Sequence, residues 1–201
     1  MRLKAAAVLL LATACAGARA QEEEVRDTAM FHHWVTSHAA PVQAFEDFLR
    51  QEQLQDVVPI HQLLRTASMW NECKAQPFQV PPRSEWAEVR GVLQLLRELR
   101  RTQVLGPFAV VSAYRDEPLN RCAGGSKRSS HMRFAVDLLP LAADDDQKLC
   151  AFWRREGKQW DMGLSRYPSG RIHVDRTGWR TWGSDHTLRT SFCNQLAEKR
   201  P

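Results

Sequence analysis

The sequence predicts an α+β fold, with a small and mostly antiparallel sheet flanked by helices. Apolar residues recur at helical spacing through the first half of the chain. Short apolar runs of strand length, separated by turn residues, follow in the second half. The chain contains no internal repeat. Helices followed by short strands are typical of the α+β class.

Three helices are expected before the first strand. The first covers 42–54, and the second covers 57–70, with Pro59 near its start. The third begins after Ser84, which can cap it, and ends before the Gly106-Pro107 pair. Its apolar stripe follows a period of 3.6 residues and consists of Trp86, Val89, Val92, Leu93, Leu95, Leu96 and Leu99.

The second half contains the predicted strands. Residues 108–112 form a buried-strand candidate, and 115–125 form a long polar loop. A second strand over 134–139 is closed by Pro140. The remaining expected elements are a helix over 144–155, short strands over 162–164 and 171–174, and a closing helix over 187–198.

Residues 1–20 have the features of a secretory signal peptide. Arg2 and Lys4 precede a short apolar stretch, and Ala18-Arg19-Ala20 has the small-x-small pattern of a cleavage site. The apolar stretch is too short to span a bilayer, so we expect an exported protein, periplasmic or secreted, with no transmembrane segment. Cys15 leaves a lipoprotein as an alternative, although the residues before it lack the Leu-like residue of that signal.

Charge argues against a nucleic-acid partner. The segment 1–20 contains three of the 28 basic residues and none of the 23 acidic residues. Removing it leaves a formal charge of only +2, whereas nucleic-acid binding favours strongly basic patches.

Four cysteines follow the signal segment, which indicates two disulfides in an exported protein. Three pairings are possible, and the sequence does not choose among them. A nucleophilic Cys122, near His131 in sequence, is the alternative. The four cysteines are Cys73, Cys122, Cys150 and Cys193.

Two separate segments offer a set of metal ligands. His131 and Asp137 lie in the first segment, and His173 lies in the second. Two imidazoles and one carboxylate suit catalytic zinc, because three protein ligands leave a position open for water. Asp137 lies inside an apolar strand, where either a metal or an ion pair with Arg115 or Arg133 would satisfy its charge.

The residues around these ligands form an ordered set of motifs. The motifs are Ser112-Ala113-Tyr114-Arg115, Asn120, Gly124-Gly125, Ser129-x-His131, Ala135-Val136-Asp137, Gly163, Tyr167, His173-Val174-Asp175 and Trp182. Over residues 108–183 this order resembles the M15 family of zinc D-Ala-D-Ala carboxypeptidases and endopeptidases. The resemblance implies a small antiparallel sheet flanked by helices, the fold shared with the hedgehog signalling domain.

The resemblance also implies roles for individual residues. Zinc ligands would be His131, Asp137 and His173. Arg115 matches the family arginine that faces the substrate and the developing oxyanion. Ser129 and Tyr167 match positions that would contact the substrate.

This chain departs from the family pattern at two places. Asp137 follows His131 by six residues, one fewer than in the family, and we expect a loop before the strand to absorb the difference. Gly170 stands where many members carry an acid three residues before the last His. An acid follows the ligand instead, as Asp175, which is a candidate general base or a residue that orients the imidazole.

Together these features predict an exported zinc metallopeptidase that hydrolyses the D-alanine-containing peptide stems of bacterial peptidoglycan in the cell wall. We expect a polar segment of little order over 21–37 and a single domain over 38–201, with a helical part (38–106) and a peptidase-like core (107–185). One alternative is a non-catalytic descendant that binds cell-wall peptides or zinc. Another is a disulfide-held structural protein of the envelope, in which the two histidines lie apart.

Overall fold

The computed structural model describes residue 22 and the ranges 24–142 and 145–198. The predicted signal peptide over 1–20 therefore lies outside the described residues. The chain divides into two compact units, Met1–Val42 and Gln43–Pro201, and the second contains all the site residues predicted above. None of the helices in the described ranges is long and apolar enough to cross a membrane.

The polar N-terminal segment contains a helix over 24–35, rather than the little order that we expected. Phe31 and Trp34 are three residues apart, so this mostly polar helix still has an apolar side. Composition alone does not show this spacing.

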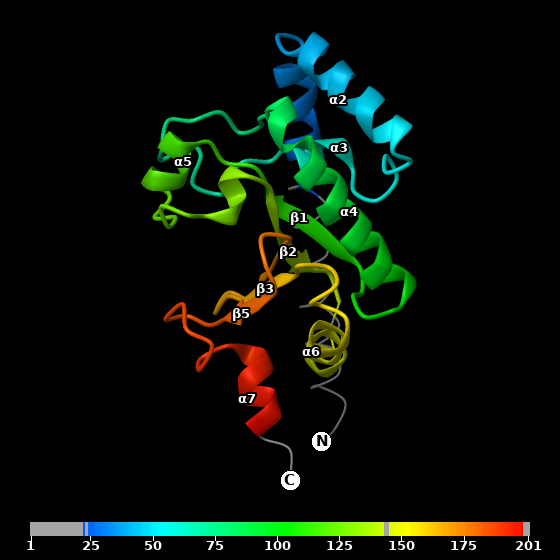
Figure 1. Cartoon of the computed structure of the whole chain (residues 1–201). Coiled ribbons are helices and arrows are strands. Elements are labelled where there is room, and N and C mark those ends of the chain that lie inside the picture. The colour runs from blue at the N-terminus through cyan, green and yellow to red at the C-terminus, as the bar shows by residue number, and fades with distance from the viewer. Residues whose placement is uncertain (1–21, 23, 143–144, 199–201) are drawn as a thin grey trace, which may run out of the picture. The chain divides into compact units, whose positions relative to one another are not determined.

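One five-stranded sheet forms the centre of the second unit in the described part of the chain (Figure 1). Its strand order is β1-β2-β4-β3-β5, and three of the four neighbouring pairs are antiparallel. Only β3 and β5 run parallel, so the predicted α+β class and mostly antiparallel sheet are confirmed. The bounds are Phe108–Ser112 (β1), Ala135–Pro140 (β2), Gly163–Arg166 (β3), Ile172–Asp175 (β4) and Arg180–Trp182 (β5).

The strand register aligns one row of polar and aromatic residues across the whole sheet. Asp137 pairs with Ser112 on one side and with His173 on the other, and Ser165 pairs with His173 and with Trp182. Paired residues point to the same face of a sheet. Two of the predicted ligands are therefore direct neighbours on one face.

The opposite face of the sheet is apolar. Val136, Val174 and Leu164 form one of its rows, and all three are fully buried. Helix α4 (Trp86–Arg101) packs against β2 (Figure 1), and its predicted stripe is buried except for Trp86, which is half-buried. This burial of apolar surface holds the sheet in place and leaves the polar row for chemistry.

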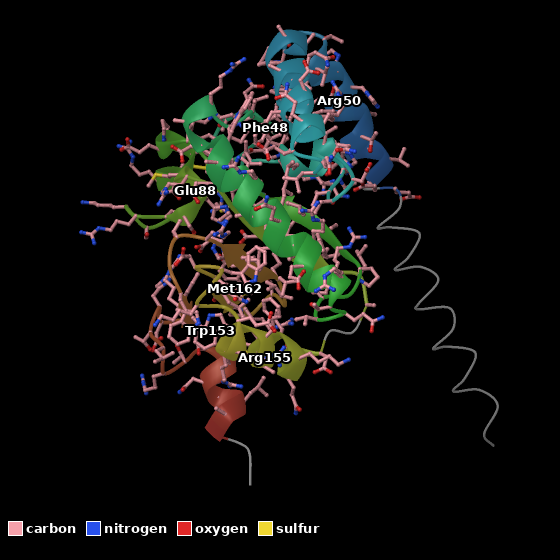
Figure 2. All side chains as sticks on the ribbon, turned by 45° about the vertical axis from the view of Figure 1, so that its right-hand side comes forward. Phe48, Arg50, Glu88, Trp153, Arg155 and Met162 are labelled. Carbon is pink, nitrogen blue, oxygen red and sulfur yellow. A yellow bond between two sulfur atoms is a disulfide. The ribbon has the colours of Figure 1, made fainter. Side chains whose placement is uncertain are left out.

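The other helices carry the remaining parts of this core. Helix α6 places Trp153 beside Met162, where the Trp153 indole N–H donates to the Met162 carbonyl oxygen at 3.2 Å (Figure 2). In α2, Phe48 packs against Trp86, with ring centroids 4.8 Å apart. The bounds are Ala39–Gln51 (α2), Arg83–Glu85 (η1), Asp146–Arg155 (α6) and Phe192–Glu198 (α7).

Two predicted elements were wrong. The helix expected over 57–70 is only the single turn α3 (Ile60–Leu63), after which the chain follows the outer edge of β1. There the Ala113 backbone N–H donates to the Arg65 carbonyl oxygen at 2.8 Å. This hydrogen bond to the residue that follows β1 uses the carbonyl group that a continuing helix would need for its own hydrogen bond. The loop expected over 115–125 contains helix α5 (Glu117–Cys122), which the Asp116 side chain caps.

Both expected disulfides are present. Cys73 is bonded to Cys122, and Cys150 is bonded to Cys193. The pairing contradicts the alternative of a nucleophilic Cys122, because its sulfur is in a disulfide. The Cys150–Cys193 bond is fully buried and joins α6 to α7.

Candidate metal centre

The three predicted ligands converge on one point. Asp137 and His173 are register partners on β2 and β4. His131 comes from the short helix η2 (Ser130–Met132), which Ser129 caps. One ligand atom from each of the three buried side chains lies within 4.8 Å of the other two.

The shorter spacing between His131 and Asp137 is absorbed ahead of the strand. His131 lies in η2, and only Arg133 and Phe134 separate this helix from β2. This tight turn brings His131 to Asp137, which points to the same face as its register partner His173.

The distances suit a tetrahedral metal site. Asp137 Oδ1 lies 3.3 Å from His131 Nε2 and 3.0 Å from His173 Nδ1. Ligand atoms held ~2.0–2.1 Å from a tetrahedral zinc ion are ~3.3 Å apart. Both distances from Asp137 Oδ1 are close to that separation, and all three ligand atoms lie within 4.8 Å of one another.

The protonation of His131 also fits a metal. Its Nδ1 lies 2.6 Å from the Ala113 carbonyl oxygen and donates to it, which leaves a lone pair on Nε2. That Nε2 is buried and has no hydrogen-bond partner among the residues that the structure describes. Burial lowers the pKa of His131, although Asp137 opposes this shift, so the ring is neutral near pH 7. A buried acceptor of this kind is costly unless a ligand such as a metal ion meets it.

His173 lies between two carboxylates. Its Nδ1 faces Asp137, and its Nε2 lies 2.8 Å from Asp175 Oδ2. Burial lowers the pKa of His173, but the hydrogen bonds to Asp137 and Asp175 outweigh it and raise the pKa to about 9. Burial raises the pKa of Asp137, but the nearby His131 and then His173 outweigh it and hold that pKa well below its usual range. Nδ1 is therefore the nitrogen on the side of the ligand Asp137, and Nε2 is the nitrogen held by Asp175.

Arg115 lies against the ligand set. Its Nη2 donates to Asp137 Oδ2 at 2.9 Å and to Ser112 Oγ at 2.8 Å. This ion pair occupies Oδ2 and leaves Oδ1 of Asp137 for the point shared with the histidines. Arg133, the other candidate partner of Asp137, pairs with Glu88 instead.

The structure separates the two adjacent serines. Ser129 accepts a hydrogen bond from the His131 backbone N–H, so it shapes the turn that carries the ligand. Ser130 is buried, and its Oγ lies 3.1 Å from His173 Nε2. No spacing in the sequence distinguishes Ser130 from its neighbour, and the prediction named only Ser129.

Tyr167 and Trp182 complete the surroundings of His173. The Tyr167 hydroxyl lies 3.3 Å from His173 Nδ1. Burial and the nearby Asp137 raise the pKa of Tyr167, so the phenol stays protonated and can donate. The Trp182 ring meets the His173 ring edge to face, with centroids 5.1 Å apart.

Asp175 is arranged to orient a ring rather than to accept a proton from water. It is fully buried, and it lies beyond Nε2, on the side of the His173 ring away from Asp137. Burial raises its pKa, but His173 and Arg180 outweigh this effect and lower it far below the usual range. Of the two roles that the sequence left open, the geometry favours the orienting one. Gly170 has φ +84° in the turn before β4 and offers no acid.

A buried His-Asp-His cluster on an α+β sheet is the type of site that metallopeptidases use. The family model described as Peptidase M15 matches residues 62–175, which is more than half of the chain and includes every predicted site residue. The chain therefore belongs to the M15 peptidase family. No curated protein and no solved structure matches the chain.

Proposed function

We propose that this chain is an exported zinc peptidase that cleaves the D-alanine-containing peptide stems of bacterial peptidoglycan, as a DD-carboxypeptidase or an endopeptidase. The observation that supports it most is the convergence of His131, Asp137 and His173 from three separate elements. The Nε2 of His131 adds to this support, because it has no partner within the described ranges and leaves an acceptor at the point where a metal would bind.

The donor set favours zinc over harder cations. Two imidazole nitrogens and one carboxylate oxygen match catalytic zinc sites, whereas magnesium and calcium prefer oxygen ligands alone. A bound zinc ion would polarise the scissile carbonyl and lower the pKa of a water molecule to ~7.

The protein side chains would supply orientation and hydrogen-bond donors. Arg115 holds Asp137 in its ligand orientation through Oδ2. The Tyr167 hydroxyl, protonated and next to the ligands, would donate to the carbonyl oxygen as negative charge develops there. Asp175 would hold the His173 ring through Nε2.

The two disulfides support the proposal that the protein is exported. Two disulfides are stable in an oxidising compartment such as the periplasm or the outside of the cell. Peptidoglycan stems are found in the same compartments, so substrate and redox conditions agree.

The first experiment compares wild type with His173→Ala for zinc content and for release of D-alanine from a pentapeptide stem ending in D-Ala-D-Ala. We expect about one zinc ion per wild-type chain and activity that the substitution abolishes. His186→Ala is the matched control, because His186 is exposed and outside the cluster.

Other results point to the alternatives. Zinc binding without D-alanine release would direct the assay to cross-linked muropeptides. Inactivity on both substrates, with retained binding of stem peptides, would favour the non-catalytic wall-binding protein. A folded wild-type chain that binds no zinc and cleaves neither substrate would refute the proposal.

A further inference from the structure

A second ion pair lies directly behind the metal ligands. Arg180 on β5 reaches Asp175 on β4 with two parallel contacts, Nη2 to Oδ2 at 2.7 Å and Nη1 to Oδ1 at 3.0 Å. Strand β3 lies between these two strands, and its residue in the same register row is Gly163. The ion pair therefore crosses over an intervening strand.

Gly163 makes this crossing possible. A Cβ at that position would lie 2.5 Å from Asp175 Oδ2 and 2.7 Å from Arg180 Nη1. Contacts this short between Cβ and polar atoms are not tolerated, so any side chain at Gly163 would push the pair apart. Gly163 is required because its lack of a side chain leaves room for the guanidinium of Arg180, and not because the backbone needs an unusual angle.

The carboxylate of Asp175 is fully occupied. Its Oδ1 accepts from the Thr177 backbone N–H at 2.7 Å, from the Thr177 hydroxyl at 2.8 Å and from Arg180. Its Oδ2 accepts from Arg180 and from His173 Nε2. A carboxylate has about four lone-pair positions, so these donors fix the orientation of Asp175.

We propose that Arg180 is a positioning residue for the metal site. By clamping Asp175 across Gly163, it keeps a carboxylate oxygen on Nε2 of His173, so that the ring carries its proton there and presents Nδ1 to the metal. Partners of this kind set the tautomer and the angle of a ligating imidazole. The inference rests on the proposed metal site, but it does not depend on the substrate.

A purely structural role is the alternative. Arg180 also stacks over Trp182, at 4.8 Å from the ring centroid, and donates to the Gly178 carbonyl oxygen. If those contacts were its purpose, removing Arg180 would lower the stability of the fold without changing how tightly the site holds a metal. Zinc affinity therefore separates the two roles.

The test measures zinc affinity by competition with a chromophoric chelator in wild type, Arg180→Met and Arg180→Lys. We expect Arg180→Met to bind zinc about 10- to 100-fold more weakly and Arg180→Lys to recover part of the loss. Arg176→Met is the matched control, since the Arg176 side chain donates to the Trp160 carbonyl oxygen and stacks on that ring, whereas the Arg180 side chain pairs with Asp175. We expect its affinity to stay within about twofold of wild type.

A second measurement reads the ring itself. In ¹⁵N spectra of the zinc-loaded protein, wild-type His173 should show a protonated Nε2 and a metal-bound Nδ1. We expect Arg180→Met to lose or broaden the Nε2–H signal. Should Arg180→Met fail to fold, Gly163→Ala tests the same crossing and should weaken zinc binding in the same way.

The results separate the failure of this inference from that of the proposed function. A wild-type chain without zinc affinity overturns both. Zinc binding by wild type, with Arg180→Met within about twofold of it and an unchanged ¹⁵N pattern, overturns the role of Arg180 alone. An equal loss of affinity in Arg176→Met would also overturn it, because the effect would then follow from general destabilisation.

Discussion

Acidification from about pH 7 to about pH 6 is expected to weaken zinc binding about tenfold, because His173 must lose a proton for each ion bound. Its pKa is about 9 in the metal-free protein, where the carboxylates of Asp137 and Asp175 outweigh the effect of burial. The ring is therefore protonated throughout this interval. Burial lowers the pKa of His131, so that ring contributes no second proton at the upper end.

Two measurements check this expectation. Competition with a chelator of known pH dependence gives the change in zinc affinity. Calorimetry in two buffers of different ionisation enthalpy gives the number of protons released, which should be about one. The interval stays below about pH 7 because zinc-bound water, with a pKa of ~7, would release a further proton above it.

Zinc affinity that does not change over this interval would refute the reasoning, and so would the release of two protons. Asp175→Asn serves as the comparison, because it removes one of the two carboxylates and lowers the pKa of His173, so the pH dependence of zinc affinity should be weaker.

The stability of the metal-free protein should change with pH in the opposite direction to the zinc affinity. Because the folded-state pKa of His173 is above its usual 6.5, its contribution to the free energy of unfolding is complete below about 6.5 and is lost as the pH rises through about 9.

Three further predictions concern other parts of the molecule. Tyr167→Phe should lower kcat by about 10²-fold with zinc content unchanged, because a donor to the developing oxyanion is lost. Steady-state kinetics and zinc analysis check this, and an unchanged kcat would contradict it. Leu96→Ala, at a fully buried position of α4, should lower the free energy of unfolding by about 2–5 kcal/mol in urea titrations. Replacing Cys150 and Cys193 with Ala opens a loop of 43 residues and should cost about 4 kcal/mol by the same assay. A cost below about 1 kcal/mol would contradict the loop-closure estimate.

Much of the sheet and its main helix could be predicted from local patterns. Strand β1 has the predicted bounds, and the stripe of α4 from Val89 to Leu99 is buried as its 3.6-residue period indicated. The apolar run of β1 and the apolar period of α4 are both visible directly in the sequence. Helix α5 and strand β5 were missed because each is short and depends on its surroundings. Helix α5 depends on the cap from Asp116, and β5 depends on pairing with β3.

The site, too, could be predicted only in part from the sequence. The family motifs indicated His131, Asp137 and His173 because those residue types recur in a known order. The contacts that orient them were not visible, since they join residues distant in the chain. Arg180 reaches Asp175 only because Gly163 lies between them in the sheet, and no local pattern indicates that relation.

The row of side chains across the sheet has a consequence for how this protein can change. Because neighbouring residues of a strand point to opposite faces, each strand position lies either on the face of the row or on the apolar face. Substitutions at Ser165 and Trp182 would alter the floor of the site while leaving the packed face intact. New specificities could therefore accumulate on one side of the sheet while stability is selected independently on the other.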